Sequence, residues 1–273
     1  MITVTNIQIV PQSIDSLKVS WTFNQTPEDF RDYTFVLERS EDPASGFVSV
    51  FDFNHALYFI DHLTYRKIWR SLYYRVTSRN IKTGETFSSK AYQLSVAPDL
   101  EALEIVRRNN IMLKNRRHGT GSPVAVFKLK TIGPKCLVCW DFNKQKVRSS
   151  TCDVCYKTGI EGGYYKPIIT WANLNPPQKL SQIPQFGERE SNEQRFFFNN
   201  EPSLNPKDLI FVPSSLIFYQ VERVETSTRR EYVLHQLVAV SGIERSSIVY
   251  RLLDEYPDLV SELTEARMNI KLK

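Results

Sequence analysis

Alternation of apolar and polar residues dominates the first hundred positions of the chain. The segments ITVTNIQIV, SLKVSW and YTFVLERS each alternate in the way that half-buried antiparallel strands do. SLYYRVTSRN and ETFSSKAYQLS follow, separated by IKTG, which supplies the glycine of a hairpin connection. Roughly seven strands within residues 1–97 predict an immunoglobulin-like β-sandwich. Its buried positions are expected to be Trp21, Phe35, Leu37, Tyr74 and Val76.

The same segment resembles a fibronectin type III domain. Trp21 ends the LKVSW strand where that family places its core tryptophan, and Tyr33 to Arg39 resembles the next strand. YYRVTSRNIKTGETFSS resembles the closing hairpin, and either Tyr73 or Tyr74 takes the role of the family's corner tyrosine. The resemblance implies a structural or attachment module, since such domains rarely do chemistry.

A helical pattern replaces the alternation over residues 98–172, which we expect to form a helix and zinc-ribbon module. PDLEALEIVRRNNIMLKNRR places Leu100, Leu103, Val106 and Leu113 along one face, with Asn110 between them. Acidic residues at its start and basic residues at its end suit the helix dipole. PVAVFKLKT then predicts a strand that leads to the first cysteine.

The last hundred residues predict an extended segment and a small barrel. Residues 173–207 are rich in Pro, Asn, Gln and Ser, which indicates an extended arm or linker. KDLIFVP, SLIFYQVERVE, REYVLHQLVAVSGI and SSIVYRLL predict strands, and a helix follows them. Residues 208–273 are therefore expected to form a small β-barrel-like domain with a C-terminal helix, and the whole chain to be mainly β.

All four cysteines lie between residues 136 and 155. Cys136 and Cys139 form one Cys-x2-Cys pair, Cys152 and Cys155 form the other, and twelve residues separate them. Two tight knuckles joined by a hairpin place four sulfurs around one ion, so this spacing predicts a structural Zn²⁺ bound by four thiolates. Disulfides and a redox dithiol are the alternatives. The chain starts without a secretory signal pattern, and a redox centre needs only one pair. His118 is expected to be a loop residue, because four sulfurs complete the site.

Positive charge concentrates around these cysteines. Residues 100–157 carry 12 Lys and Arg against 4 Asp and Glu, whereas the whole chain has a net charge of +5. Four thiolates and one Zn²⁺ would lower the +8 of this segment to about +6. Candidate contacts to DNA phosphates or to an acidic partner are Arg107, Arg108, Arg116, Arg117, Lys144, Lys146 and Arg148, and Lys128 and Lys130 belong to the same surplus. A solvated surface is the simpler interpretation. Trp140 and Phe142 either cover the metal or stack on bases.

Motifs of catalysis and of membrane insertion are missing from the sequence. It contains no phosphate-binding Gly-x4-Gly-Lys loop, no Gly-x-Ser-x-Gly elbow and no His-Glu-x2-His pair. No apolar stretch is long enough to span a membrane. We therefore expect a protein that is not an enzyme and has no membrane partner.

The segment around the cysteines resembles zinc-containing virion proteins of tailed bacteriophages. The shared pattern is Cys136-x2-Cys139, the basic VRSS, Cys152-x2-Cys155, Tyr156, Thr158-Gly159, Gly162-Gly163-Tyr164-Tyr165 and Pro167. The barrel segment resembles phage head-completion and stopper proteins at Asp208, Tyr219, Val221 and Gln236, to which only a structural role is carried over.

These resemblances imply a virion protein of the neck or head–tail connector, assembled in the host cytoplasm. It would form a homo-oligomeric ring on portal, connector or tail proteins, with non-specific contact to packaged DNA as an option. Two alternatives stay open: a nucleic-acid-binding zinc-ribbon protein, and a baseplate or fibre-attachment adaptor.

Overall fold

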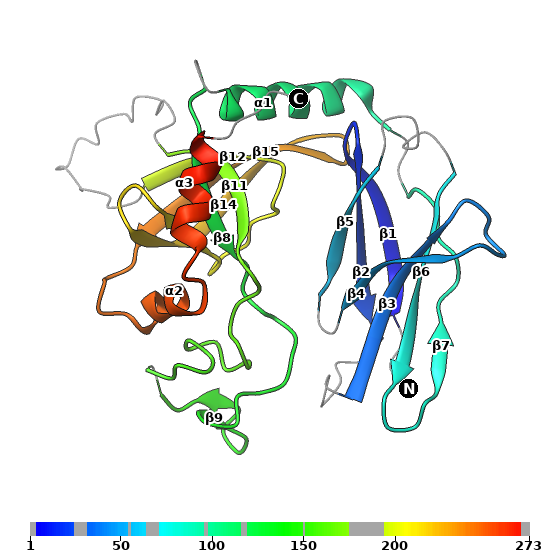
Figure 1. The fold of residues 1–273 in the computed structure, drawn as a ribbon, viewed down its shortest axis with the longest axis horizontal. Coiled ribbons are helices and arrows are strands. Elements are labelled where there is room, and N and C mark those ends of the chain that lie inside the picture. Colours follow the sequence, from blue (N-terminus) through cyan, green and yellow to red (C-terminus); the bar gives the residue numbers. More distant parts are fainter. Residues whose placement is uncertain are drawn as a thin grey trace, which may run out of the picture. The chain divides into compact units, whose positions relative to one another are not determined.

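The computed structural model describes residues 4–24, 32–53, 56–63, 71–95, 98–115, 119–149, 151–174 and 194–268. The protein is mainly β, as predicted. It divides into two compact units (Figure 1): Met1–Glu104 with Thr131–Lys135, and Ile105–Lys130 with Cys136–Lys273.

The first unit is a sandwich of two antiparallel sheets. One sheet has the order β1-β2-β5, formed by Val4–Ser13, Ser16–Phe23 and Tyr58–His62. The other has the order β4-β3-β6-β7, formed by Val48–Phe53, Tyr33–Ser40, Tyr73–Asn80 and Thr86–Ser88. The sandwich expected from the alternation is therefore present, whereas its relation to the fibronectin type III family stays a prediction.

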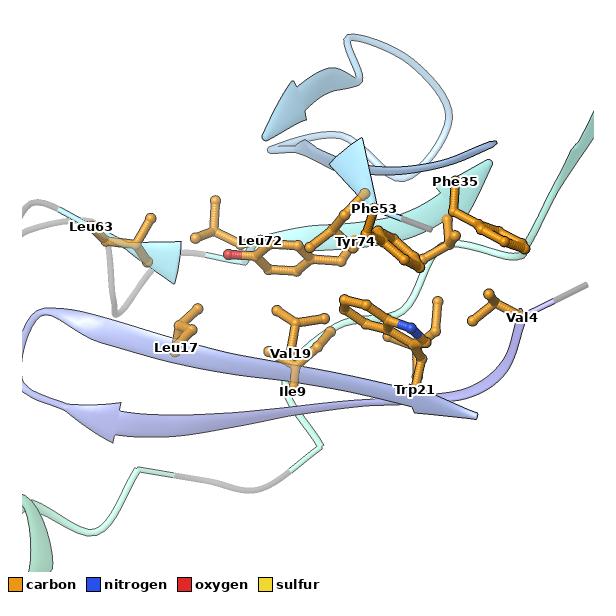
Figure 2. Packing of buried hydrophobic residues seen from close by; sticks show 13 residues of the cluster. Val4, Ile9, Leu17, Val19, Trp21, Phe35, Phe53, Leu63, Leu72 and Tyr74 are labelled. Carbon is orange, nitrogen blue, oxygen red and sulfur yellow. The ribbon is translucent and has the colours of Figure 1, made fainter. Parts of the chain in front are cut away.

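Large apolar side chains from both sheets fill the space between them (Figure 2). The rings of Trp21 on β2 and Phe53 on β4 have their centroids 4.4 Å apart, and the Trp21 indole donates a hydrogen bond of 2.9 Å to the Ala56 carbonyl. The five positions expected in this core are all buried: Trp21, Phe35, Leu37, Tyr74 and Val76. Strict alternation along β2, β3 and β6 explains why the sequence located them.

Tyr74, and not Tyr73, is the buried tyrosine of β6. Its hydroxyl donates a hydrogen bond of 2.7 Å to Asp61 Oδ2, and Arg39 Nη1 lies 2.6 Å from the same oxygen. Burial, followed by the charge of Asp61, raises the pKa of Tyr74 well above its usual range. The tyrosine therefore stays neutral and ties β6 to β5.

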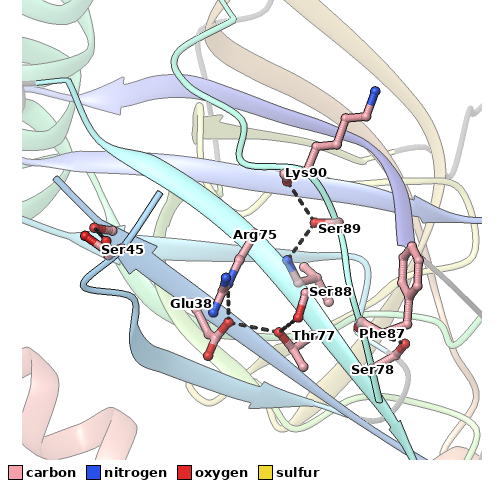
Figure 3. Close-up of polar contacts among 11 residues, drawn as sticks. Glu38, Ser45, Arg75, Thr77, Ser78, Phe87, Ser88, Ser89 and Lys90 are labelled. Carbon is pink, nitrogen blue, oxygen red and sulfur yellow. Dashed lines mark hydrogen bonds and ion pairs between the residues drawn. The ribbon is translucent and has the colours of Figure 1, made fainter. Parts of the chain in front are cut away.

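The outer face of the four-stranded sheet is polar (Figure 3). The Glu38 carboxylate on β3 accepts hydrogen bonds from Arg75 Nε at 2.6 Å and from Thr77 Oγ1 at 2.9 Å, both on β6. The Thr77 hydroxyl is also within 2.9 Å of Ser88 Oγ on β7. Cross-strand pairs of this kind stabilise a solvated sheet face, so this side of the sandwich needs no covering layer.

The second unit contains a closed six-stranded barrel with the order β11-β12-β15-β14-β13-β8. Its strands, in chain order, are β8 Ser122–Phe127, β11 Ile168–Asn173, β12 Gln194–Asn199, β13 Leu209–Val212, β14 Ile217–Arg229 and β15 Tyr232–Gly242. Val124 and Val126 of β8 point into the barrel core, whereas Ala125 and Phe127 pack in a second core with the C-terminal segment. Burial on both faces explains the uninterrupted apolar run of β8.

The barrel contains strands that precede the expected range 208–273. β8 and β11 come from the segment expected to be a helix and zinc-ribbon module, and β12 comes from the expected arm at 173–207. Residues 175–193 of that arm lie outside the described residues. The pairings β8–β13 and β12–β15 join segments that are far apart in the chain, so local alternation could not assign them to one barrel.

Helices close one side of the barrel. SSIVYRLL, expected to be a strand, forms the 3-10 helix η3 Ile248–Arg251 and the start of α2 Leu252–Glu255, and α3 Leu259–Met268 follows as the predicted C-terminal helix. Leu252, Leu259 and Leu263 pack against Phe127 and Phe218. A short apolar run suits a strand or a buried helix equally well, which explains the wrong prediction.

Helix α1 spans Leu100–Lys114, within the predicted pattern. The Asp99 side chain caps its start and accepts hydrogen bonds from the N–H groups of Glu101 and Ala102 at 3.1 and 3.2 Å. Leu103, Val106 and Leu113 are buried as predicted, whereas Leu100 is exposed.

Candidate metal centre

The four cysteines converge on one point, as their spacing predicted. All four are buried, and their sulfur atoms lie within 4.8 Å of one another. A small hairpin between the knuckles brings them together: β9 Trp140–Asp141 pairs antiparallel with β10 Lys146–Val147. Among the described residues this is the group of His, Cys, Asp and Glu side chains placed to hold a metal ion.

Sulfur–sulfur distances separate a metal centre from disulfides. Cys136 Sγ lies 3.8 Å from Cys152 Sγ, and Cys139 Sγ lies 3.1 Å from Cys155 Sγ. A disulfide requires about 2.05 Å. Four sulfurs placed tetrahedrally at about 2.3 Å from one ion are about 3.8 Å apart, which matches the Cys136–Cys152 distance, whereas Cys139 and Cys155 lie closer together. The four thiols are free, and their arrangement fits a metal ion.

Backbone hydrogen bonds shape the two knuckles alike. The Trp140 N–H donates to the Cys136 carbonyl at 3.0 Å, and the Tyr156 N–H donates to the Cys152 carbonyl at 3.1 Å. Each bond closes one turn around the two residues between the cysteines, so both sulfurs of a pair point to the same side. The spacing of two residues is therefore a consequence of turn geometry.

The pKa values of the cysteine thiols bear on whether the site holds a cation. Burial raises the pKa of the Cys139 and Cys155 thiols. At Cys152 burial also acts upward, but hydrogen bonds from the N–H groups of Cys155 and Val154 outweigh it and lower the pKa to about 7. At Cys139 and Cys155 burial therefore favours the protonated thiol, and metal binding, which needs thiolates, would displace those protons.

Gly159 lets the chain fold back over the centre. Its φ is +77°, and a Cβ at this position would lie 2.7 Å from two ring carbons of Trp140. Its carbonyl accepts the Cys136 N–H at 3.0 Å. Trp140 therefore packs on the segment that follows the second knuckle, whereas Phe142 is 61 % exposed and covers nothing there.

Tyr156 anchors the second knuckle to the C-terminal helices. Its ring lies in the core formed with Phe127 and Leu252, and its hydroxyl donates a hydrogen bond to Glu255 of α2. Burial, followed by the Glu255 carboxylate, raises the pKa of Tyr156 above its usual range. The metal centre is thereby joined to the helices that close the barrel.

Asp208 and Lys128 form a buried ion pair at the end of β8, the strand that leads to the metal ribbon. Asp208 accepts hydrogen bonds from Lys128 Nζ, from the Leu129 N–H at 2.9 Å and from the Asn205 N–H at 2.7 Å. Lys128 also donates to the Ser203 carbonyl at 2.6 Å. This lysine was expected in the basic surplus, but its burial removes it from any contact surface. The position of Lys128 directly after the buried, apolar strand β8 was the signal for its burial.

Gln236 on β15 organises the loop that follows β12. Its amide nitrogen donates to the carbonyls of Asn199 at 3.0 Å and Pro202 at 2.9 Å, and its oxygen accepts the Leu204 N–H at 2.8 Å. Val221 is buried in the barrel core, and Tyr219 packs against that core. All four positions compared with phage stopper proteins therefore serve the barrel's own structure.

The candidate basic residues occupy two places and not one. Arg107 and Arg108 are exposed on α1, and Lys144, Lys146 and Arg148 are exposed on the β9–β10 hairpin. Within the second unit, α1 and β9 lie at opposite ends in Figure 1. Arg116, Arg117 and His118 lie outside the described residues.

Comparison of the sequence with protein-family models and with curated proteins finds no match. Among the helices that the structure describes, none has the length and apolar character needed to cross a bilayer. The metal centre is therefore the feature of the described structure that bears most directly on function.

Proposed function

We propose that this protein is a non-enzymatic structural component of a tailed-phage virion, part of the neck or head–tail connector, and that it assembles as a ring. The observation that carries the proposal is the closed four-sulfur centre built into the barrel unit. Four buried sulfurs leave no position open for water or substrate, so a metal held there serves structure and not catalysis.

The residues that carry the phage resemblance support this role. Gly159 accommodates Trp140, and Tyr156 enters the core of the barrel unit. At Gly163 the φ is +52°, and a Cβ would lie 2.7 Å from the Cys155 carbonyl oxygen. Each of these residues shapes the ribbon or fastens it, and none is placed as an acid, base or nucleophile. Such a pattern is expected of a scaffold.

Zinc is the metal we infer for the centre. A tetrahedral set of four thiolates suits Zn²⁺ or iron, and it does not suit Mg²⁺ or Ca²⁺. Binding of a structural Zn²⁺ contributes on the order of 10 kcal/mol, which is enough to order a hairpin with two-residue strands. The ion would therefore fold the ribbon and, through Tyr156, steady the C-terminal helices.

Metal analysis of the purified full chain tests this assignment. We expect one zinc per chain and no visible absorption. Cys152→Ser should lose most of the metal, whereas Ser149→Ala, on the same ribbon outside the sulfur cluster, should keep it. Iron with its visible charge-transfer bands, or metal-free protein with two disulfides, would contradict the assignment.

Localisation in particles tests the assembly role. Virions made by the genome that encodes this chain should contain it in several copies at one ring of the neck, visible by cryo-electron microscopy and by mass spectrometry of purified particles. Light scattering of the isolated protein should detect ring-sized oligomers, alone or with portal or tail proteins. Absence from mature particles would reject the proposal, whatever metal the protein holds.

A further inference from the structure

Four apolar side chains of the metal ribbon are exposed. Leu137 is 73 % exposed and Val138 is 71 % exposed, between the cysteines of the first knuckle. Phe142, in the hairpin that follows, is 61 % exposed, and Val154 of the second knuckle is 37 % exposed. We name these four residues the ribbon tip. Single exposed apolar residues are ordinary on protein surfaces, whereas four on one small metal ribbon favour a contact surface.

Metal binding does not require this composition. The two knuckles share their backbone hydrogen bonds and differ in the intervening residues, which are Leu137 and Val138 in the first and Asp153 and Val154 in the second. Asp153 shows that the first of these positions accepts a charged residue. Leu137 therefore exposes apolar surface at a place where the fold itself tolerates a polar side chain.

Cations border the ribbon tip. The Arg148 N–H donates to the Cys139 carbonyl at 2.7 Å, which places Arg148 beside the first knuckle, and its guanidinium pairs with Asp141 at 3.2 Å. Lys144 and Lys146 are exposed on the same hairpin, and neither pairs with a carboxylate among the described residues. A partner surface that supplies Asp or Glu side chains around an apolar centre would complement this arrangement.

The net charge of the ribbon distinguishes a protein partner from a nucleic-acid partner for the ribbon tip. Residues 136–157 contain four cationic side chains, two carboxylates and the four cysteines. With four thiolates and one divalent ion, the loaded ribbon has no net formal charge. Binding to DNA draws its free energy from phosphate neutralisation, for which this ribbon offers no surplus. Leu137 and Val138 gain nothing from phosphates, whereas an apolar pocket would remove them from water.

We propose that the ribbon tip docks into an apolar pocket bordered by acidic side chains on a different protein. Leu137, Val138 and Phe142 would be the anchors, and Lys144 and Lys146 would pair with the acidic border. This inference deepens the proposed structural role, and it rests on that role only for the expectation that the partner is a neighbouring protein of the assembly.

Selection of random peptides displayed on yeast against the zinc-loaded full chain tests the inference. Selected peptides should combine Leu, Ile, Phe or Trp with Asp or Glu. The double variant L137S/V138S should weaken binding of a selected synthetic peptide about tenfold or more. K144E/K146E should weaken it as well. Val48→Ser, which removes a side chain 66 % exposed on β4, is the matched control and should leave binding unchanged.

Three results would overturn the inference. The first is selected peptides without this composition, or peptides that bind L137S/V138S as well as the parent. The second is tip-dependent binding of a labelled DNA duplex that falls steeply with salt. The third is self-association that L137S/V138S abolishes, which would make a second copy the occupant. Zinc content and circular dichroism verify that each variant is folded. Because none of these measurements uses virions, the inference can fail while the protein is still found in particles.

Discussion

Replacement of Lys128 by methionine tests how the barrel unit holds together. Methionine keeps an unbranched stem of similar length and removes the ammonium. In the native protein that ammonium binds the Asp208 carboxylate and the Ser203 carbonyl, and the side chains of Lys128 and Asp208 are 9 % and 1 % exposed. Lys128→Met therefore leaves a buried carboxylate without its counter-ion.

The expected cost follows from what remains around Asp208. Removal of one partner of a buried ion pair typically destabilises by about 3–5 kcal/mol. Asp208 keeps two backbone donors, Leu129 N–H and Asn205 N–H. They stabilise the carboxylate in part, so we expect about 3 kcal/mol. Asp208→Asn should cost a similar amount. The double variant K128M/D208N should cost clearly less than the sum of the two, because it leaves no isolated charge.

Hydrogen exchange of the zinc-loaded full chain measures this effect locally. Amides of β13 and β14 flank the pair in the barrel, and their protection reports the free energy of opening. A loss of about 3 kcal/mol corresponds to roughly 150-fold faster exchange. Arg223→Met is the matched control, because Arg223 pairs with Glu225 at 2.9 Å on the surface, where both side chains are about half exposed. Its effect should stay below about 1 kcal/mol.

Two results would refute this account of the pair. Lys128→Met could change the protection of β13 and β14 no more than Arg223→Met does. Alternatively, the costs of Lys128→Met and Asp208→Asn could simply add in the double variant. Zinc content has to stay at the parent's level, so that a loss of protection is not caused by an unfolded ribbon.

Three further predictions concern the metal ribbon and the tyrosines. Gly159→Ala puts a Cβ against the Trp140 ring at φ +77° and should weaken zinc retention against a chelator about tenfold or more. Gly84→Ala is the control: at φ +73° in open space it carries only the backbone cost of about 1 kcal/mol and should leave zinc retention unchanged. Tyr156→Phe removes the hydrogen bond to Glu255, so amide hydrogen exchange within α3 should become about tenfold faster at an unchanged zinc content. An unchanged exchange rate would show that the hydroxyl does not stabilise the helices. Burial raises the pKa of Tyr165 to about 12, above the value near 10 in the unfolded chain. The stability that this tyrosine contributes is therefore complete below about pH 10 and is lost as the pH rises towards 12. In Tyr165→Phe the denaturation midpoint should fall less than in the parent between about pH 10 and pH 12.

The sequence was sufficient for features encoded by local spacing. Cys136, Cys139, Cys152 and Cys155 converge because two-residue knuckles impose the direction of each sulfur pair. The alternation in β2, β3 and β6 likewise located the sandwich core, because a strand's period of two fixes which side chains share a face. It located Tyr74 in the core but left open which of Tyr73 and Tyr74 forms the structural hydrogen bond, since the acceptor Asp61 lies on another strand.

Only the tertiary structure decided features that depend on partners distant in the chain. The sequence determined that strands, a helix and a four-cysteine ribbon exist. It did not determine that β8 and β11 on either side of the ribbon close one barrel with the last strands, because strand pairing is non-local. For the same reason the sequence placed Lys128 in a basic surface, whereas in the structure it forms a buried ion pair. Its partner Asp208 lies 80 residues away in the chain. Local geometry fixed the metal centre, and long-range pairing fixed the barrel that carries it.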